Sequence, residues 1–261
     1  MNFENVQLET SNHIATIKLN MPGSFNTLTD ELKADLLRAI ELCADDDDTK
    51  VVVITGSGKA FCAGGDINLF KDSSNVSDRL RQGLKIVNLI IIGIRRMPKP
   101  VIAAINGVTG GAGVSIAAAC DLRICASSVK FKIGYTSIGL IPDGGWTLLV
   151  PQLIGFSKAT ELVLLDSPFD AEKALEYGFV NIVVPNERLD EEVYAVAQKL
   201  AKGPSVSYAI TKGNLNHAMY GLLERQLELE REGMIRAGRT DDSKEGFKAF
   251  LEKRSPSFKG K

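Results

Sequence analysis

Two short apolar runs, each followed by glycine-rich sequence, constrain the fold of this chain more than any other feature. Val51–Thr55 (VVVIT) leads into Gly56-Ser57-Gly58, and Val101–Ile105 (VIAAI) leads into Asn106-Gly107. Continuous apolar runs of this length are typical of strands buried on both faces in α/β proteins. Further short strands are expected at Ile14–Leu19, at Leu122–Cys125 and around Phe131 and Val183-Val184. These repeated strand–turn–helix units predict an α/β fold built from stacked turns of a spiral.

Helical periodicity alternates with the strands and takes over near the C-terminus. Thr29 or Asp30 is expected to cap a helix whose apolar face recurs at Leu32, Leu36, Ile40 and Cys43. From Leu189 onward the pattern is purely helical. We therefore predict a spiral core over residues 1–188 and a helical region over residues 189–261, which would pack on that core or on a neighbouring subunit.

Composition narrows the classes of function. The 31 Lys and Arg residues balance 32 Asp and Glu, and this net charge of −1 argues against a nucleic-acid or membrane-surface partner. No apolar run approaches a membrane span, and the N-terminus lacks a secretory signal pattern, so a cytoplasmic protein is expected. The four cysteines lack metal-ligand spacing and are expected to be reduced core thiols. With only two histidines, neither a metal site nor histidine-based catalysis is expected.

Two segments place backbone N–H groups where a helix is expected to begin. Lys59–Ile67 (KAFCAGGDI) follows the first buried strand, and Gly110–Gly113 (GGAG) follows the second. Glycine lets the backbone approach a ligand closely, and a helix N-terminus offers N–H groups without intrahelical partners. Taken singly, such turns usually serve packing. Two of them that converge would form an oxyanion hole, which polarises a carbonyl and stabilises an enolate.

In this order and spacing, the segments resemble the enoyl-CoA hydratase/isomerase (crotonase) superfamily over essentially the whole chain. The resemblance is carried by Asn26, KAFCAGGDI, PKPVIAAINGVTGGAG, CDLRICA, GLIPDGGWTLL and the C-terminal EGFKAFLEKRSPSFKGK. The last segment, with GRTDDSKEG before it, looks especially like the branch of phenylacetate-pathway isomerases that act on epoxyphenylacetyl-CoA. The resemblance implies a crotonase (ClpP-like) spiral of ββα units with a helical C-terminal extension. It also implies an acyl-CoA thioester substrate, no metal or redox cofactor, a homotrimer or hexamer, and a place in fatty acid or phenylacetate catabolism.

The motif positions imply which residues would hold the thioester. In the family, two backbone amides hold the thioester oxygen, and these fall here on Gly65 and Ala112, beside Gly64 and Gly111. Removing one donor of this kind from an enzyme costs roughly 2.7–4 kcal/mol of transition-state stabilisation.

Other motif positions imply contacts farther along the substrate. Ala63 and Ile67 would form walls near the adenine end of CoA. Phe250 and Lys253 occupy the C-terminal motif that, in the family, often reaches the CoA of a neighbouring subunit. Tryptophan is more often a core residue than a ligand platform, but the place of Trp146 beside Asp143 keeps it a pocket candidate.

The chain departs from the family at both hydratase carboxylates. Ser115 and Tyr135 stand where family hydratases have glutamates, and each is expected to line the acyl pocket or to serve packing. Hydration uses a water held between two carboxylates, so ordinary hydratase chemistry is not expected. Asp143, in LIPDGGW, remains at the position where phenylacetate-type isomerases carry their acid/base.

Asp143 has a structural and a catalytic interpretation. Pro-Asp-Gly is a common turn, but with two upstream amide segments we favour the catalytic role. Asp143 would remove the α-proton of a 3-enoyl-CoA and return it at the γ-carbon, and apolar burial would have to raise its pKa. A ring-opening isomerisation of an epoxyaryl acyl-CoA is a narrower version of this isomerase hypothesis. The alternatives are a hydratase with a non-standard site and a non-catalytic acyl-CoA-binding protein.

Other features are expected to be structural or remain unassigned. Asp66 is expected to cap the following helix, and Asp121 to be a buried, hydrogen-bonded carboxylate. The stretch Asp72–Ser77 is expected to shape the acyl pocket. The identity of the acyl chain cannot be derived from these residues.

Overall fold

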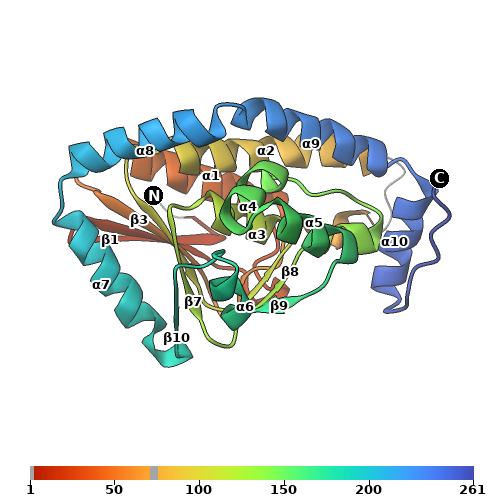
Figure 1. Cartoon of the computed structure of the whole chain (residues 1–261), viewed down its shortest axis with the longest axis horizontal. Helices are drawn as coiled ribbons and strands as arrows, with labels where there is room; N and C mark the ends of the chain where they lie inside the picture. The colour runs from red at the N-terminus through yellow and green to blue at the C-terminus, as the bar shows by residue number, and fades with distance from the viewer. Residues whose placement is uncertain (1–2, 71–75) are drawn as a thin grey trace.

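The computed structural model, which describes residues 3–70 and 76–261, contains two sheets enclosed by helices (Figure 1). The larger sheet has the strand order β1-β2-β3-β5-β7-β10, and the smaller sheet has the order β4-β6-β8-β9. The larger sheet contains β1 (Val6–Ser11), β2 (Ile14–Leu19), β3 (Val51–Gly56), β5 (Val101–Ile105), β7 (Leu122–Ala126) and β10 (Ile182–Val184). The smaller sheet contains β4 (Ala60–Cys62), β6 (Val108–Gly110), β8 (Lys130–Lys132) and β9 (Phe169–Asp170).

Each central turn of the chain gives one strand to each sheet. Strands β3, β5 and β7 pair in parallel in the larger sheet, and the strands that follow them, β4, β6 and β8, pair in parallel in the smaller one. Helix α3 (Ala112–Ala119) then carries the chain from β6 to β7. The predicted α/β spiral of ββα units is therefore confirmed.

The helices pack around this spiral. The first six are α1 (Asp30–Asp45), α2 (Val76–Arg96), α3, α4 (Trp146–Ile154), α5 (Phe156–Leu165) and α6 (Ala171–Glu176). They are followed by α7 (Leu189–Ala201), α8 (Ser205–Tyr220), α9 (Leu223–Ala237) and α10 (Asp241–Leu251). Helix α2 lies between α1 and α9, α7 covers β3, β5 and β7, and α10 lies at the opposite end near the C-terminus (Figure 1). The helical region from residue 189 is thus packed on the spiral.

Local sequence accounts for most of these elements, and packing accounts for the rest. Thr29 caps α1 by accepting a hydrogen bond from the Leu32 N–H at 3.2 Å. The strand β1 was not expected, because only Val6 of its six residues is buried and its sequence carries little apolar pattern. It forms by antiparallel pairing with β2 through the left-handed residues Asn12 and His13.

The apolar interior contains all four cysteines, which are buried and unpaired. The helices that the structure describes are all too short or too polar to cross a membrane.

Asn26 fixes the loop that leads from the larger sheet toward the glycine segments. Its side chain is fully buried, where Oδ1 accepts a hydrogen bond from the Met21 N–H at 2.8 Å and Nδ2 donates to the Ala60 carbonyl at 2.8 Å. A short distance along the loop, the Leu28 N–H donates to the Gly64 carbonyl at 2.8 Å. The turn after β4 is therefore held from the N-terminal side of the chain.

Candidate active site

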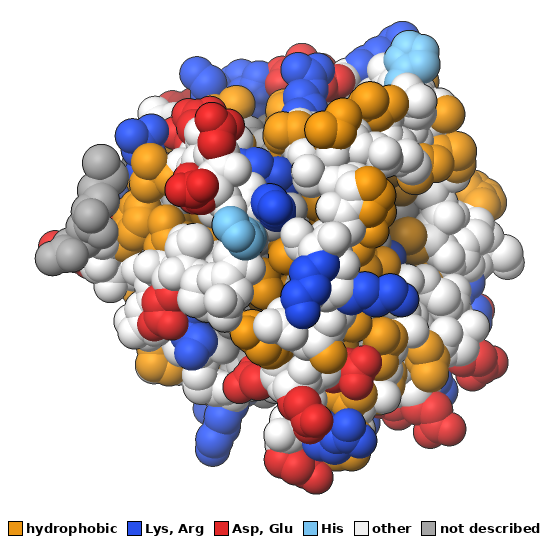
Figure 2. Space-filling model, turned by 90° about the vertical axis from the view of Figure 1, so that its left-hand side faces the viewer, with side chains coloured by type: hydrophobic (Ala, Val, Ile, Leu, Met, Phe, Trp, Pro, Cys, Tyr) orange, Lys and Arg blue, Asp and Glu red, His pale blue; other side chains and the backbone are white. Residues whose placement is uncertain are grey.

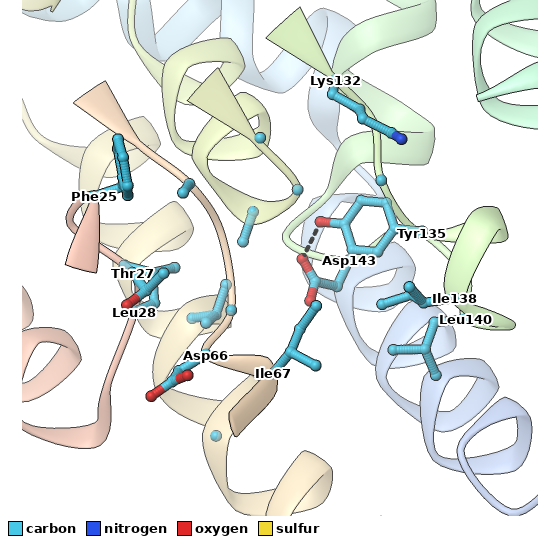
Figure 3. Close-up of a pocket in the computed structure, with 18 of the residues that line it drawn as sticks. Phe25, Thr27, Leu28, Asp66, Ile67, Lys132, Tyr135, Ile138, Leu140 and Asp143 are labelled. Atoms are coloured by element: carbon cyan, nitrogen blue, oxygen red, sulfur yellow. Dashed lines mark hydrogen bonds between the residues drawn. The ribbon is translucent and has the colours of Figure 1, made fainter. Parts of the chain in front are cut away.

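A cavity of about 970 Å³ lies between α1, α2, the segment after β4, the β6–α3 loop and the 3-10 helix η3 (Thr136–Ile138). A cavity of this size holds a drug-sized ligand or part of a larger one. Most residues singled out from the sequence line it: Ala63, Gly65, Ile67, Gly111, Ala112, Tyr135, Asp143 and Phe250. In Figure 3, Tyr135, Asp143 and Leu140 lie on one side of this space, and Phe25, Leu28 and Asp66 lie on the other. Segments from distant parts of the chain thus meet at one site.

The two glycine-rich segments approach one another closely at this cavity. Gly64 has a φ of +93°, and a Cβ there would lie 2.9 Å from the Gly110 carbonyl oxygen and 3.3 Å from the Ala112 nitrogen. Ala112 is the first residue of α3, so its N–H precedes the first intrahelical hydrogen bond. Within the described residues, the Gly65 N–H makes no backbone hydrogen bond either. Two free N–H groups therefore lie on the wall of one cavity.

Asp143 presents a buried carboxylate to the same cavity. Asp143 lies in the chain between η3 and α4, and only 8% of the residue is exposed. Oδ1 accepts a hydrogen bond from the Tyr135 hydroxyl at 2.7 Å, as the dashed line in Figure 3 marks. One carboxylate oxygen is thus engaged by the protein, and Oδ2 is available to a ligand.

Burial sets the protonation behaviour of this pair. Desolvation raises the pKa of Asp143 to about 6, although the Tyr135 hydrogen bond and the charge of Lys33 act in the opposite direction. Desolvation and the neighbouring carboxylate raise the pKa of Tyr135 well above its usual value. Tyr135 therefore stays protonated as a donor, while Asp143 is able to take and release a proton near neutral pH.

Four of the predicted site residues do not line the cavity, and two of them, Ser115 and Trp146, are buried in the interior. Ser115 is fully buried in α3, and its hydroxyl donates to the backbone carbonyl of Asp143 at 2.7 Å. Trp146 is 2% exposed and packs into the core at the start of α4, instead of lining the cavity as expected from its place beside Asp143. Ser115 thus supports the acid from behind, because its side chain points to the Asp143 backbone and not to the ligand space.

The loop that carries Asp143 is held by a residue that the sequence analysis missed. Glu230 of α9 is 4% exposed, and its carboxylate accepts hydrogen bonds from the Gly145 N–H at 2.7 Å, from the Thr147 N–H at 2.8 Å and from the Thr147 hydroxyl. These N–H groups stand at the N-terminus of α4, whose N-cap, Gly145, has no side chain to satisfy them. The sequence did contain a signal for this residue. Glu230 falls on the helix face that Leu223, Leu227 and Met234 make apolar, and a charged residue on such a face is expected to have a buried partner.

Glu230 is electrostatically linked to the acid that it supports. Desolvation raises the pKa of Glu230 to about 7, opposed by its three hydrogen bonds, and the negative charge of Asp143 raises it further. Two carboxyl groups with raised pKa values therefore lie at one turn. Clusters of this kind are more frequent at functional sites than elsewhere.

The remaining predicted residues take different places. Phe250 lines the cavity and is 56% exposed, whereas Lys253 is exposed beyond the end of α10 and does not contribute to the described wall. Gly64 makes the close backbone approach described above and is not itself part of that wall. Asp66 accepts hydrogen bonds from the backbone and side chain of Asn68, as expected of a capping residue.

Two further expectations concern residues away from the acid. Asp121 was expected to be buried but is half-buried; it pairs with Arg95 at 3.1 Å and Lys212 at 2.7 Å, as expected of a structural carboxylate. Of the stretch Asp72–Ser77, residues 72–75 lie outside the described residues, and Val76 and Ser77 begin α2.

Comparison with known proteins identifies the relatives of this site. The family model described as enoyl-CoA hydratase/isomerase matches residues 9–261. The chain is 38% identical to 1,2-epoxyphenylacetyl-CoA isomerase of Escherichia coli over 95% of both chains. It is 33% identical to trans-2-decenoyl-[acyl-carrier-protein] isomerase of Streptococcus mutans over the full length of both. A crystal structure of an enoyl-CoA hydratase from Mycobacterium avium subsp. paratuberculosis superposes with a TM-score of 0.90 at 32% identity, covering 99% of this chain and 100% of that one.

Replacement of Glu230 tests its support of the Asp143 loop. In Glu230→Gln, an amide nitrogen would face one of the N–H donors at the start of α4, so we expect the free energy of unfolding to fall by about 2 kcal/mol. Urea denaturation measures this change. Glu232→Gln, on an exposed position of the same helix, is the matched control and should change little. Equal unfolding free energies for the two variants would show that Glu230 does not hold the loop.

Proposed function

The chain belongs to the enoyl-CoA hydratase/isomerase (crotonase) family, and we propose that it shifts the double bond of a 3-enoyl-CoA thioester to the 2-position, with Asp143 as the acid/base. One observation carries the proposal. Among the described residues that line the cavity, Asp143 is the one buried carboxylate, since Asp30 is exposed and Asp66 is half-exposed. A reaction that moves one proton between two carbons needs one such group.

The first step would polarise the thioester and remove its α-proton. The Gly65 and Ala112 N–H groups would donate to the thioester oxygen, which makes the α-hydrogen more acidic and stabilises the negative charge of the dienolate. Oδ2 of Asp143, opposite the oxygen bonded to Tyr135, would accept the proton. The electron pair of the C–H bond then becomes part of a dienolate that extends from the thioester oxygen to the γ-carbon.

The second step would return the proton to the γ-carbon. The dienolate carries electron density at that carbon, so protonation there by Asp143 yields the conjugated 2-enoyl-CoA and restores the carboxylate. The pKa of about 6 suits both directions of transfer, because the group is neither too weak a base nor too weak an acid. Tyr135 keeps Asp143 in one orientation throughout, since its hydroxyl remains a donor.

Hydration is the less favoured reaction for this site, although relatives with hydratase names are numerous. It requires a water placed between a base and an acid that act on neighbouring carbons. The other carboxylates on the described wall are engaged elsewhere: Asp30 with Lys33 at 2.8 Å, and Asp66 with Asn68 at 3.0 Å. Ser115, which stands at a family glutamate position, faces the Asp143 backbone.

The narrower parts of the proposal rest on the relatives. The similarity to 1,2-epoxyphenylacetyl-CoA isomerase supports an aryl or ring-containing acyl group in the substrate. With such a substrate the enzyme would act in phenylacetate catabolism, and with a plain acyl chain it would act in fatty acid metabolism. Proton transfer of this kind uses no metal or redox cofactor. Four buried free thiols suit a reducing compartment, so we propose a cytoplasmic enzyme.

We further propose that copies of this chain assemble into trimers or hexamers, as the family resemblance implies. Large apolar side chains of α8 are exposed on the single chain, among them Val206, Ile210, Leu215 and Met219. Figure 2 shows hydrophobic patches between charged side chains on one face of the molecule. Exposed apolar area of this kind marks association surfaces. A single-chain mass by light scattering would contradict this part of the proposal.

Incubation with paired substrates tests the reaction. We expect the wild-type protein to convert a 3-enoyl-CoA into a conjugated thioester without a change in mass. Ultraviolet absorbance would detect the conjugation, and mass spectrometry would show that the mass is unchanged. Asp143→Asn should slow this conversion by at least about 100-fold, because it removes the acid/base. Asp47→Asn, at an exposed position after α1, is the matched control and should keep wild-type activity.

Parallel incubations with a 2-enoyl-CoA and with an epoxyaryl acyl-CoA distinguish the proposed isomerase from a hydratase, a ring-opening isomerase and a non-catalytic binding protein. Addition of one water to the 2-enoyl-CoA that survives Asp143→Asn would contradict the isomerase and favour a hydratase. Turnover of an epoxyaryl acyl-CoA alone would narrow the reaction to ring opening. Binding of all thioesters without turnover would favour the non-catalytic alternative.

The pH dependence of kcat/KM tests the Tyr135–Asp143 pair. Asp143 must be ionised to act as base, so activity should fall about tenfold per pH unit below a pKa of about 6. In Tyr135→Phe the carboxylate loses a hydrogen-bond donor that lowers its pKa, and the acidic limb should move to higher pH. Tyr194→Phe, on the exposed part of α7, should leave the profile unchanged. If the acidic limb of Tyr135→Phe lay at the same pH as that of the wild-type protein, the assignment of this limb to the Tyr135–Asp143 pair would be contradicted.

A further inference from the structure

The cavity wall carries a charged group that takes no direct part in the proposed proton transfer, although its charge acts on Asp143. Lys33 of α1 is 5% exposed, and its Nζ lies 2.8 Å from Oδ1 of Asp30. The other cations on the described wall, Arg79, Lys130 and Lys132, are all exposed. Lys33 is thus the one buried cation among the described residues of this wall.

The neighbouring helix leaves space for the ammonium group. Gly83 of α2 also lines the cavity, and a Cβ at this position would lie 2.8 Å from the Lys33 Nζ. The buried residues Leu80, Leu84 and Val87 of the same helix form the apolar wall around Gly83. The ammonium therefore lies against the gap that Gly83 leaves beside these apolar side chains, while the exposed Arg79 and Gln82 of the same helix also line the cavity.

A chain of contacts relates this ammonium to the candidate acid. A Cβ at Gly144, the residue after Asp143, would lie 3.4 Å from Cγ1 of Val87. Val87 is four residues beyond Gly83, which is about one turn of helix. The ammonium and the turn that carries the acid thus lie against positions of α2 that are about one helical turn apart, Gly83 and Val87. A thioester whose α-carbon is at Asp143 would direct the distal part of its acyl group along this face.

The hydrogen-bonding capacity of Lys33 is incompletely used. An ammonium has three donors, and in the described residues Asp30 is its one ion-pair partner. The side chain of Asp30 is 64% exposed, so water competes for that partner. Burial of a cation beside leucine and valine side chains is unfavourable unless a further acceptor compensates for the lost hydration.

We propose that Lys33 forms a polar subsite for the acyl group, and that it selects acyl-CoA substrates that carry a hydrogen-bond-accepting oxygen over plain hydrocarbon chains. The oxygen would belong to a hydroxyl, an ether or a carboxylate beyond the reacting carbons. This inference rests on the proposed function in that it takes an acyl-CoA to occupy the cavity. The opposing interpretation is that Lys33 only pairs with Asp30 and contributes its hydrocarbon stem to the wall.

Binding of unreactive ligands tests the subsite without any need for turnover. We would measure by calorimetry the Kd of saturated acyl-CoA thioesters in a length series, each ending in a methyl, a hydroxyl or a carboxylate group. At one chain length, the wild-type protein should bind an oxygen-bearing thioester at least about tenfold more tightly than its methyl counterpart, as expected of a charge-assisted hydrogen bond in a dry site. Comparison of the Kd values of the hydroxyl-terminated and carboxylate-terminated thioesters shows whether the subsite prefers a neutral acceptor or an anion.

Variants assign the preference to the ammonium group. Lys33→Met keeps the apolar stem, so it should abolish the preference and leave binding of the methyl-terminated thioester unchanged or tighter. Lys85→Met, at an exposed position of α2 outside this cavity, is the matched control and should keep the preference. Melting temperatures of both variants report whether each folds.

The outcomes for the subsite and for the proposed function are distinguishable. Equal affinities for all three end groups in the wild-type protein, or a preference that survives Lys33→Met in a folded protein, would overturn the subsite alone. Absence of binding by every thioester would contradict the proposed function and the subsite together.

Discussion

The close approach of two backbone segments is the constraint on which the rest of this site depends. Gly64 lies against the Gly110–Ala112 loop so closely that a side chain at Gly64 would collide with it. The approach follows from the paired short strands β4 and β6, which end at the same edge of the smaller sheet. A Cβ at Gly113 would lie 2.2 Å from the Cys62 carbonyl oxygen, so α3 also needs a glycine in its first turn. Gly65 and Ala112, whose N–H groups make no backbone hydrogen bond within the described residues, then line one cavity because these two segments are held together.

The candidate acid is held between elements that are far apart in the sequence. Tyr135 fixes the carboxylate, Ser115 fixes the backbone carbonyl, and Glu230 of the C-terminal region fixes the turn that follows. Burial disfavours the charge of Asp143, and the Tyr135 hydroxyl partly offsets this effect, which leaves a pKa of about 6. The helical region from residue 189 thus contributes directly to the site, because α9 supplies the cap that α4 lacks. This arrangement would let one carboxylate both accept and return a proton, as the proposed reaction requires.

The sequence predicted the parts of the structure that local chemistry determines. Buried strands such as β3 and glycine-rich turns have distinct local patterns, so the spiral and the two amide segments could be predicted. The three-residue strands β4 and β6 could not, because they exist only through pairing within the smaller sheet. Motif position likewise did not reveal that Trp146 points into the core or that Ser115 faces the backbone of Asp143. Glu230 escaped notice because its partners lie 85 and 83 residues away in the chain.

Proton removal by Asp143 is the central claim, and hydrogen exchange in heavy water measures it most directly. A saturated acyl-CoA has no double bond to move, yet its α-protons are exposed to the same base and the same two amides. Incubated in deuterium oxide with the wild-type protein, such a thioester should gain deuterium at the α-carbon, seen by mass spectrometry, and Asp143→Asn should abolish the gain. Exchange that continues undiminished in Asp143→Asn would contradict the account, because another group would then be the base.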